Sequence, residues 1–325
     1  MAFARSWRHA WISEGPERVS VNEIPQLNAV FSESFTERYR KDGMVGVRVP
    51  HLNPAVWKFA ISDAEDGAMV WRTARDSIAA FNMVHRSGVE GWMGPLAVHP
   101  DHQGQGVGKA IVNAGVEWLK HRGAKVIGLE TMPRTMDNVG FYSSLGFTPG
   151  HLTVTVTLEG ARAGIQSTPL SALSPHEREL ALRQCRQLLS ELAPGYDYTR
   201  EIVLTAQHQL GETVMVRNGA DVRSFAICHS APLVEGRATE EMRVLKMVAR
   251  SEADFDTLVT QLCAHARIRA ARRIAIRVQG QYSDVYRRLI ARGARVRWTD
   301  LRMSVHGYAE SRAANGGIVL SNWEI

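Results

Sequence analysis

Cysteine is scarce in this chain of 325 residues, which holds Cys185, Cys228 and Cys263 and no others. The three are odd in number, lie far apart and form no CxxC pair, so the sequence predicts neither a disulfide framework nor a zinc site. Uncharged apolar stretches fall well short of a bilayer span, and the first fifteen residues lack the apolar block of a secretory signal. We therefore expect a protein of the reducing cytoplasm with no membrane partner.

Clustered aromatic residues are missing from the most basic part of the chain, residues 267–297. The net charge is +6, and much of the basic excess is spread there over an expected helix, a strand and a second helix. Since no nucleic-acid-binding motif accompanies these arginines, they indicate a solvated face rather than a nucleic-acid partner. A weaker alternative is that they attract the phosphates of an anionic acyl donor.

The length and composition allow two domains with separate cores, since 45% of the residues are hydrophobic and 22% are charged. Between residues 159 and 175 the composition changes to Gly, Ala, Ser, Thr and Pro. Such a stretch is typical of a linker. We therefore expect a first domain at residues 1–160, a linker at 161–175 and a second domain at 176–325.

Hydrophobic periodicity and capping residues predict alternating helices and strands along the whole chain. In the first half, the expected helices are 25–41, a segment capped by Asn53 and begun by Pro54, 106–122 and 138–145, and the expected strands are 67–74, 78–85, 91–98, 125–132 and 151–158. In the second half, the expected helices are 175–192, 252–267 and 283–292, and the expected strands are 213–217, 222–229, 242–249, 273–278 and, as the last, 296–305.

The two halves repeat one order of elements. The strand at 96–98 corresponds to that at 245–248, the helix at 109–120 to that at 255–266, and Tyr142 to Tyr286. A duplicated α/β fold explains this repetition more simply than two unrelated domains would.

Three glycines at alternate positions, Gly104, Gly106 and Gly108, lead from an apolar strand that stops at Pro100 into a helix. Glycines let the main chain approach a ligand closely, and the N–H groups of such a turn point to a place where the helix dipole favours negative charge. The spacing is neither GxGxxG nor a nucleotide P-loop, because Ala110 follows Lys109. The sequence therefore predicts a pyrophosphate-binding loop. The alternative, a glycine-rich turn without a ligand, would lose backbone entropy to no use.

At these residues the chain resembles the GNAT superfamily of GCN5-related N-acetyltransferases. The family signature Gln/Arg-x-x-Gly-x-Gly/Ala is met by Gln103, Gly106 and Gly108, and the segment 96–100 is similar to the family's splayed strand. The resemblance covers residues 18–158 and implies two tandem acyl-CoA N-acyltransferase (GNAT) domains, each a mixed, twisted α+β sheet flanked by helices. In the second half the matching junction at 247–253 has no glycine and carries Glu252, so that half resembles a degenerate GNAT domain.

The resemblance implies acetyl-CoA as co-substrate and no metal. The amides of residues 103–109 would hold the CoA pyrophosphate, and the main chain of Leu96 and Val98 would pair with the pantetheine arm as an added strand does. The residues expected to bind acetyl-CoA are Leu96, Ala97, Val98, Gln103, Gly104, Gln105, Gly106, Val107, Gly108, Lys109, Asn138, Phe141 and Tyr142. Many members carry Asn where this chain has Thr135. His99 and His102 are interpreted as loop histidines, because no further metal ligands lie nearby in the sequence.

The segment 138–147 is similar to the family's short helix that ends in Phe-Tyr-x-x-Leu-Gly-Phe. It implies that the phenol of Tyr142 protonates the departing CoA thiolate; the alternative is an aromatic that packs the helix on the sheet. Glu130 lies twelve residues before Tyr142, the spacing of the general base in the similar ribosomal-protein alanine N-acetyltransferases. Glu90 and water are the competing bases. The sheet is expected to splay beside Val98, where a strand amide would meet the oxyanion.

The sequence therefore predicts an acetyl-CoA-dependent N-acetyltransferase that moves the acetyl group directly to a primary amine of a small molecule or a peptide. A non-catalytic acyl-CoA sensor is the alternative function. A longer acyl chain is a further alternative, which depends on the pocket depth near Met93 and Gly94. Acceptor specificity is expected to reside near residues 31–50, and a homodimer is left open.

Overall fold

The computed structural model describes residues 12, 15–161 and 169–323. The strands are β1 Glu17–Arg18, β2 Ala68–Arg72, β3 Ile78–Ser87, β4 Glu90–Val98, β5 Val126–Thr131, β6 Phe147–Glu159, β7 Gly211–Asn218, β8 Asp221–His229, β9 Glu241–Ala249, β10 Arg273–Gln279, β11 Arg295–Val305 and β12 Ile318–Ser321. The α-helices are α1 Ile24–Lys41, α2 Pro54–Ala64, α3 Val107–His121, α4 Met136–Ser144, α5 Pro175–Leu192, α6 Thr199–Gln207, α7 Glu252–Ile268 and α8 Ser283–Ala291.

One continuous sheet joins the two halves of the chain. Its order is β1-β2-β3-β4-β5-β11-β6-β10-β9-β8-β7, and β12 pairs with β9. Apart from β1 and β12, the order reads as two equivalent sets, because β2 to β5 on one side correspond to β7 to β10 on the other. The mixed α/β sheet and the duplicated fold expected from the sequence are therefore present.

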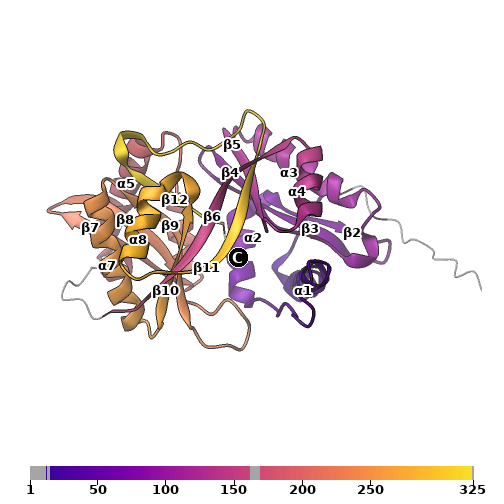
Figure 1. Ribbon diagram of the computed structural model, residues 1–325, viewed down its shortest axis with the longest axis horizontal. Coiled ribbons are helices and arrows are strands. Elements are labelled where there is room, and N and C mark those ends of the chain that lie inside the picture. Colours follow the sequence, from indigo (N-terminus) through magenta and orange to yellow (C-terminus); the bar gives the residue numbers. More distant parts are fainter. Residues whose placement is uncertain (1–11, 13–14, 162–168, 324–325) are drawn as a thin grey trace, which may run out of the picture.

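The two halves exchange their last long strands. In the first half, β5 pairs antiparallel with β11 of the second half, while β6 pairs antiparallel with β10. The exchanged strands β6 and β11 also pair with each other and run side by side between the halves (Figure 1). The expected linker at 161–175, of which residues 162–168 lie outside the described part, separates the halves along the chain but not within the sheet.

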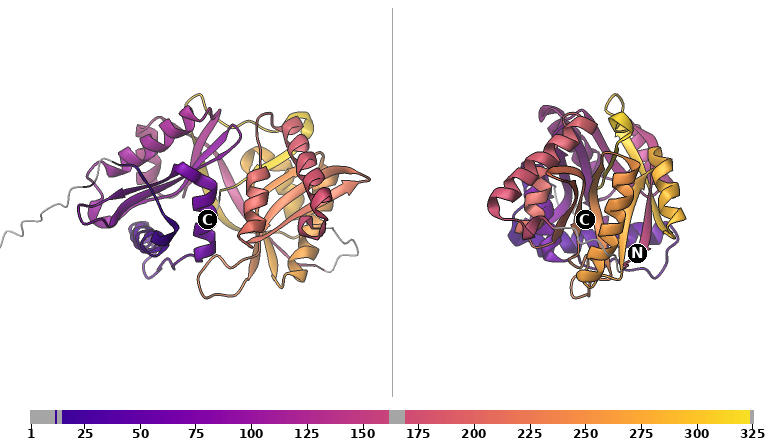
Figure 2. Two further views of the ribbon diagram at one scale, coloured as in Figure 1. Left: turned by 180° about the vertical axis from the view of Figure 1, so that it is seen from behind. Right: turned by 90° about the vertical axis from the view of Figure 1, so that its left-hand side faces the viewer.

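Helices cover both faces of the sheet in each half, as the two further views show (Figure 2). In the first half, Leu27, Phe31 and Trp57 of α1 and α2 are buried on one face, and Ile111 and Leu119 of α3 are buried on the other. Asn53 caps α2 as expected, since its side-chain oxygen accepts a hydrogen bond of 3.0 Å from the amide of Ala55. Apolar spacing of this kind places one face of each helix against the sheet.

Two elements of the second half differ from the sequence prediction. Helix α6 was not expected, because its short pattern gave no clear apolar stripe. The expectation that the strand at 296–305 is the last was wrong, since β12 follows it and pairs antiparallel with β9, Ile318 opposite Ala249 and Ser321 opposite Lys246. A strand of four residues is too short to show an alternating pattern.

The three cysteines lie within the described part of the chain. Cys185, Cys228 and Cys263 are free thiols in the cores of the second half. Within the described ranges, none of the helices combines the length and the apolar character that crossing a bilayer requires.

Candidate functional site

Strand β4 separates from its neighbour β5 partway along its length. The two strands pair in parallel from Glu90–Val126 to Met93–Leu129, and β4 then continues to Val98. A register shift against β3 lies at the same level, where the carbonyl oxygen of Gly94 is 3.1 Å from Nε2 of His85. The sheet therefore splays from Met93 onward, several residues before the predicted position at Val98.

A cavity of about 450 Å³ borders the far end of β4, between α1, α3 and α4. It is lined by nine of the thirteen residues expected to bind acetyl-CoA: Leu96, Ala97, Val98, Gln103, Gly104, Gly108, Asn138, Phe141 and Tyr142. The other four, Gln105, Gly106, Val107 and Lys109, lie in the same loop and the first turn of α3 without lining the cavity. We refer to it below as the donor cavity.

The three glycines of the loop differ in what requires them. Gly104 and Gly106 have φ angles of +76° and +83°, a conformation in which a side chain is strained, and Gly106 is the N-terminal cap of α3. At Gly108 a Cβ atom would lie 3.3 Å from the ring of Phe141. Two glycines thus bend the chain, and the third lets α3 approach α4 beside the donor cavity.

The side chain of Gln103 reaches back to the end of β4. Its Nε2 donates to the carbonyl oxygen of Val98 at 3.0 Å, and its Oε1 accepts from Nζ of Lys41 at 3.2 Å. Ser34 of α1 also donates to the carbonyl of Val98, at 3.1 Å. Gln103 therefore fixes the loop to the strand, and α1 brings a lysine to the cavity.

Sequence reasoning missed the contribution of α1 to the donor cavity. Ser34, Phe35, Arg38 and Lys41 line it together with the expected residues. Arg38 is held by Asp42 at 2.6 Å and by Asp137 at 3.3 Å. The basic last turn of this helix was visible in the sequence, but nothing in its spacing indicated which loop it would face.

Tyr142 lies on α4 with 7% of its surface exposed and lines the donor cavity. Burial raises the pKa of its phenol to about 12. The phenol is therefore protonated at neutral pH and can donate a hydrogen bond. A donor with so high a pKa favours a hydrogen bond to a departing sulfur over complete proton transfer.

The position at which many GNAT proteins carry Asn serves a structural contact in this chain. Thr135 is fully buried, and its hydroxyl donates to Oδ2 of Asp42 at 2.6 Å. Asn138 lines the donor cavity instead, and its Nδ2 is 3.4 Å from Oγ1 of Thr131. Thr135 thus anchors the start of α4 to the end of α1.

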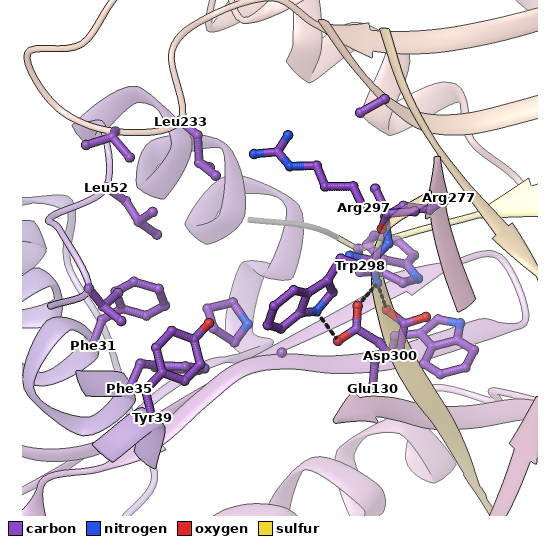
Figure 3. Close-up of a pocket in the computed structure, with 18 of the residues that line it drawn as sticks. Phe31, Phe35, Tyr39, Leu52, Glu130, Leu233, Arg277, Arg297, Trp298 and Asp300 are labelled. Carbon is purple, nitrogen blue, oxygen red and sulfur yellow. Dashed lines mark hydrogen bonds and ion pairs between the residues drawn. The ribbon is translucent and has the colours of Figure 1, made fainter. Parts of the chain in front are cut away.

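A second cavity, of about 520 Å³, lies between the two halves (Figure 3). Met93, Gly94 and Pro95 of β4 border it, as does Phe35, which also borders the donor cavity. The second half closes the opposite side with Leu233, Ala275, Arg277, Arg297, Trp298, Asp300, Arg302 and Trp323. We call it the interdomain cavity. The sequence did not predict it, because the strand exchange that brings these residues together leaves no local pattern.

Glu130 projects from β5 into a group of arginines from the second half. Its Oε1 accepts from Nη1 of Arg302 at 2.8 Å and from Thr153 at 2.5 Å, and its Oε2 is bonded to Nη2 of Arg277. Burial alone would raise the pKa of Glu130, but the positive charges of Arg277 and Arg302 outweigh it and lower that pKa below 4.5. A carboxylate so held takes up a proton poorly.

Glu90, the competing base, lies away from both cavities. It is fully buried and accepts hydrogen bonds from Trp92 at 3.1 Å, Tyr198 at 3.2 Å and Ser321 at 2.8 Å. Ser321 belongs to β12 and Tyr198 directly precedes α6, two elements that the sequence did not reveal.

Of the two loop histidines, His99 contacts acidic side chains. Nε2 of His99 lies 2.7 Å from Glu33, and Nδ1 of His99 accepts from the amide of Asp101 at 3.3 Å. Among the residues that the structure describes, no group of three or more His, Cys, Asp or Glu side chains is arranged to hold a metal ion.

The second half closes its equivalent of the donor cavity with its own chain. Strand β9 pairs in parallel with β10 from Glu241 to Val244, as β4 pairs with β5 from Glu90 to Met93. Beyond this point, from Lys246 to Ala249, β9 pairs with β12. The equivalent stretch of β4, from Pro95 to Val98, is the one where the sequence predicts that the pantetheine arm adds as a strand.

Comparison with known protein families finds a match within the first half. Residues 28–147 match the model of the Acetyltransferase (GNAT) family. The uncharacterized N-acetyltransferase YobR of Bacillus subtilis is 28% identical over 142 residues, which are 43% of this chain and 49% of YobR. The chain spans about half the length of the curated relatives it matches.

Solved structures match the whole described fold. A GCN5-related N-acetyltransferase from Sphaerobacter thermophilus aligns over 95% of this chain and 98% of its own, with a TM-score of 0.55 and 13% identity. A tandem GNAT protein from the clavulanic acid biosynthesis pathway aligns over 91% and 99%, with a TM-score of 0.57 and 11% identity. At these identities the likeness shows the fold alone, and it extends over both halves of the chain.

Proposed function

We propose that this chain, a member of the GNAT superfamily of acetyltransferases, transfers the acetyl group of acetyl-CoA directly to a primary amine. One observation carries the proposal: the two cavities meet at β4. Leu96, Ala97 and Val98 border the donor cavity, and the preceding Met93, Gly94 and Pro95 border the interdomain cavity. A thioester that follows the strand would have its acyl carbon where an amine in the interdomain cavity can reach it.

The donor cavity has the features that an acyl-CoA requires. The loop at Gly104–Gly108 opens α3 with main-chain amides, which bind phosphate at a helix N-terminus, and Lys41 adds a cation at its rim. Beyond Met93, strand β4 no longer pairs with β5, so a pantetheine arm can lie along this edge as an added strand does. We assign the CoA pyrophosphate to the loop and the pantetheine arm to Leu96 and Val98.

The chemistry of the transfer needs one bond formed and one broken. The amine nitrogen attacks the thioester carbon, the C–S bond breaks, and a proton leaves the nitrogen as the sulfur departs. We assign to Tyr142 the hydrogen bond that stabilises the departing sulfur, and to a β4 amide near Val98 the oxyanion. Glu130 stays the predicted general base, with water as the alternative that its lowered pKa favours.

We also propose that the second half holds no acyl-CoA and builds the acceptor site instead. Strand β12 occupies the edge of β9 that corresponds to the donor edge of β4. The loop after β8 reaches the first half, where the amide of Asn53 donates to the carbonyl of Leu233 at 2.9 Å. These contacts support a role in closing the interdomain cavity.

Release of free thiol from acetyl-CoA, measured across a panel of primary amines, tests the proposal. We expect thiol release that depends on the amine, together with an acetylated product. That product should be about 42 Da heavier than the amine, because an acetyl group replaces one hydrogen on the nitrogen. Acetyl-CoA that binds tightly while every amine fails to release thiol would instead support the acyl-CoA sensor. No observation in the structure favours that second function over transfer.

A further inference from the structure

The interdomain cavity has two unlike walls (Figure 3). On one side, Phe31, Phe35 and Tyr39 project from successive turns of α1, and the rings of Phe31 and Phe35 are 4.6 Å apart between centroids. On the other side, Trp298 of β11 stands in front of the charged residues Glu130, Arg277 and Asp300. An aromatic wall thus faces an indole across the space where the acceptor is proposed to bind.

Trp298 is both exposed and oriented. It retains 40% of its exposure although it belongs to a central strand. Its indole Nε1 donates to Oδ1 of Asp300 at 3.1 Å, and Asp300 is bonded in turn to Nη2 of Arg277 at 3.0 Å. The ring stays exposed and adds little to the hydrophobic core, while its N–H group holds it in one orientation. Such a side chain is typical of a surface that binds a ligand.

The opposite wall approaches the same carboxylate. Tyr39 of α1 and Asp300 of β11 line the cavity from opposite walls. Burial raises the pKa of the Tyr39 phenol, and the negative charge of Asp300 raises it further. The space between them is open to solvent and lies beside Gly94 and Pro95. A flat apolar group can therefore lie between Trp298 and the α1 rings while an attached amine extends toward β4.

From these contacts we propose that the acceptor is an arylalkyl primary amine, a small molecule whose aromatic ring lies between Trp298 and the rings of Phe35 and Tyr39. The inference rests on the proposed function, since it assigns the substrate class of the same transfer site. Aliphatic polyamines and amino sugars have no aromatic ring to lie between these side chains, and their polar groups would lose water against Phe31 and Phe35.

Steady-state transfer from acetyl-CoA to four amines tests the assignment: 2-phenylethylamine, tryptamine, spermidine and glucosamine. We expect kcat/KM for the two aryl amines to exceed that for the others by at least about tenfold. Trp298→Ala should lower it about tenfold for the aryl amines alone, and Trp298→Phe should restore most of it. The KM for acetyl-CoA should not change. Val296→Ala, on the same strand and 52% exposed, is the matched control.

Binding measurements separate a failure of this inference from a failure of the proposed function. Calorimetry with 2-phenylethylamine and the protein, with and without CoA, should show binding that Trp298→Ala and Tyr39→Leu weaken, whether or not transfer occurs. Transfer to all four amines with equal efficiency would overturn the aryl assignment and leave the transfer function standing. Binding of the aryl amine without thiol release would support the proposed aromatic site between Trp298 and the α1 rings but contradict the transfer function. If the aryl amine neither bound nor was preferred as acceptor, the proposed aromatic site would be contradicted.

Discussion

At the scale of single residues, Tyr142 is the side chain whose chemistry is most open to test. Tyr142→Phe keeps the ring that packs in the donor cavity and removes the hydroxyl. We expect kcat to fall about 10²-fold, because the departing sulfur loses its donor, with little change in the KM for acetyl-CoA. Tyr286→Phe, at the corresponding position of the second half, is the control and should leave kcat unchanged. Equal rates for Tyr142→Phe and the parent would show a packing role alone.

The pH dependence of transfer follows from the same side chain. The phenol must be protonated to donate, and burial raises its pKa to about 12, so it stays protonated through pH 10. A tyrosine at its usual pKa of about 10 would be half ionised there. We expect kcat to rise with pH as the acceptor amine loses its proton, without a descending limb up to about pH 10.5. A descending limb near pH 9 to 10 that disappears in Tyr142→Phe would contradict the burial argument.

Glu130 can act as a general base or as an ion-pair partner, and a single substitution distinguishes the two roles. Glu130→Gln keeps the shape of the side chain but leaves Arg277 and Arg302 without its charge. We expect the free energy of unfolding to decrease by about 3 kcal/mol, as for other broken buried pairs. Denaturation in urea measures it, with the exposed Glu117→Gln as control. Unchanged stability with transfer abolished would identify Glu130 as the general base.

The ion pair also sets how stability depends on acid. A carboxyl whose folded pKa lies below its unfolded value stabilises the protein above the unfolded pKa of about 4.5. That contribution is lost as the pH falls through the lower, folded value. The parent should therefore lose stability in this acid range more steeply than Glu130→Gln.

At the scale of elements, the close approach of α3 and α4 depends on Gly108. In Gly108→Val the new Cβ would lie 3.3 Å from the ring of Phe141, which borders the donor cavity. We expect the displaced ring to raise the KM for acetyl-CoA at least tenfold. Gly140→Ala, on the exposed side of α4 where a Cβ meets nothing within 4 Å, should bind acetyl-CoA as the parent does. Unchanged affinity in Gly108→Val would contradict the placement of the cofactor in this cavity.

The sequence predicted the elements whose signals are local. Helical spacing and the Asn53 cap located α1 and α2 closely, and the glycine pattern located the turn before α3. The same reasoning missed β12, α6 and the interdomain cavity. The position of β12 depends on its pairing with β9, and the interdomain cavity depends on the pairing of β5 with β11, more than a hundred residues apart. No spacing within a segment encodes such pairings.

The residues of the candidate site were also predicted only where they lie close together in the chain. Nine residues that line the donor cavity could be named from the sequence because they lie in one segment from Leu96 to Tyr142, whereas those of α1 could not. The lining of the interdomain cavity was missed because residues such as Trp298 and Asp300 come from the exchanged strand β11. The ionic partners of Glu130 were hidden for the same reason, so its pKa could not have been anticipated from its neighbours in the chain.

At the scale of the whole molecule, the pairing of β12 with β9 limits the number of donor sites. The edge of β9 from Lys246 to Ala249 already has a strand beside it. We expect one CoA bound per chain in a calorimetric titration, and one CoA occupying the first half in a crystal soaked with it. A second equivalent of CoA bound with similar affinity would show that the ligand displaces β12 from the edge of β9.

The strand exchange has a consequence for how this protein is made. The flank of β5 that carries Glu130 is covered only when residues 295–305 become available, because β11 supplies the neighbouring strand. A nascent chain that has left the ribosome as far as the first half alone therefore presents an unpaired sheet edge to solvent. Until translation has passed β11, this edge can pair with the wrong strand, and the interdomain cavity cannot form.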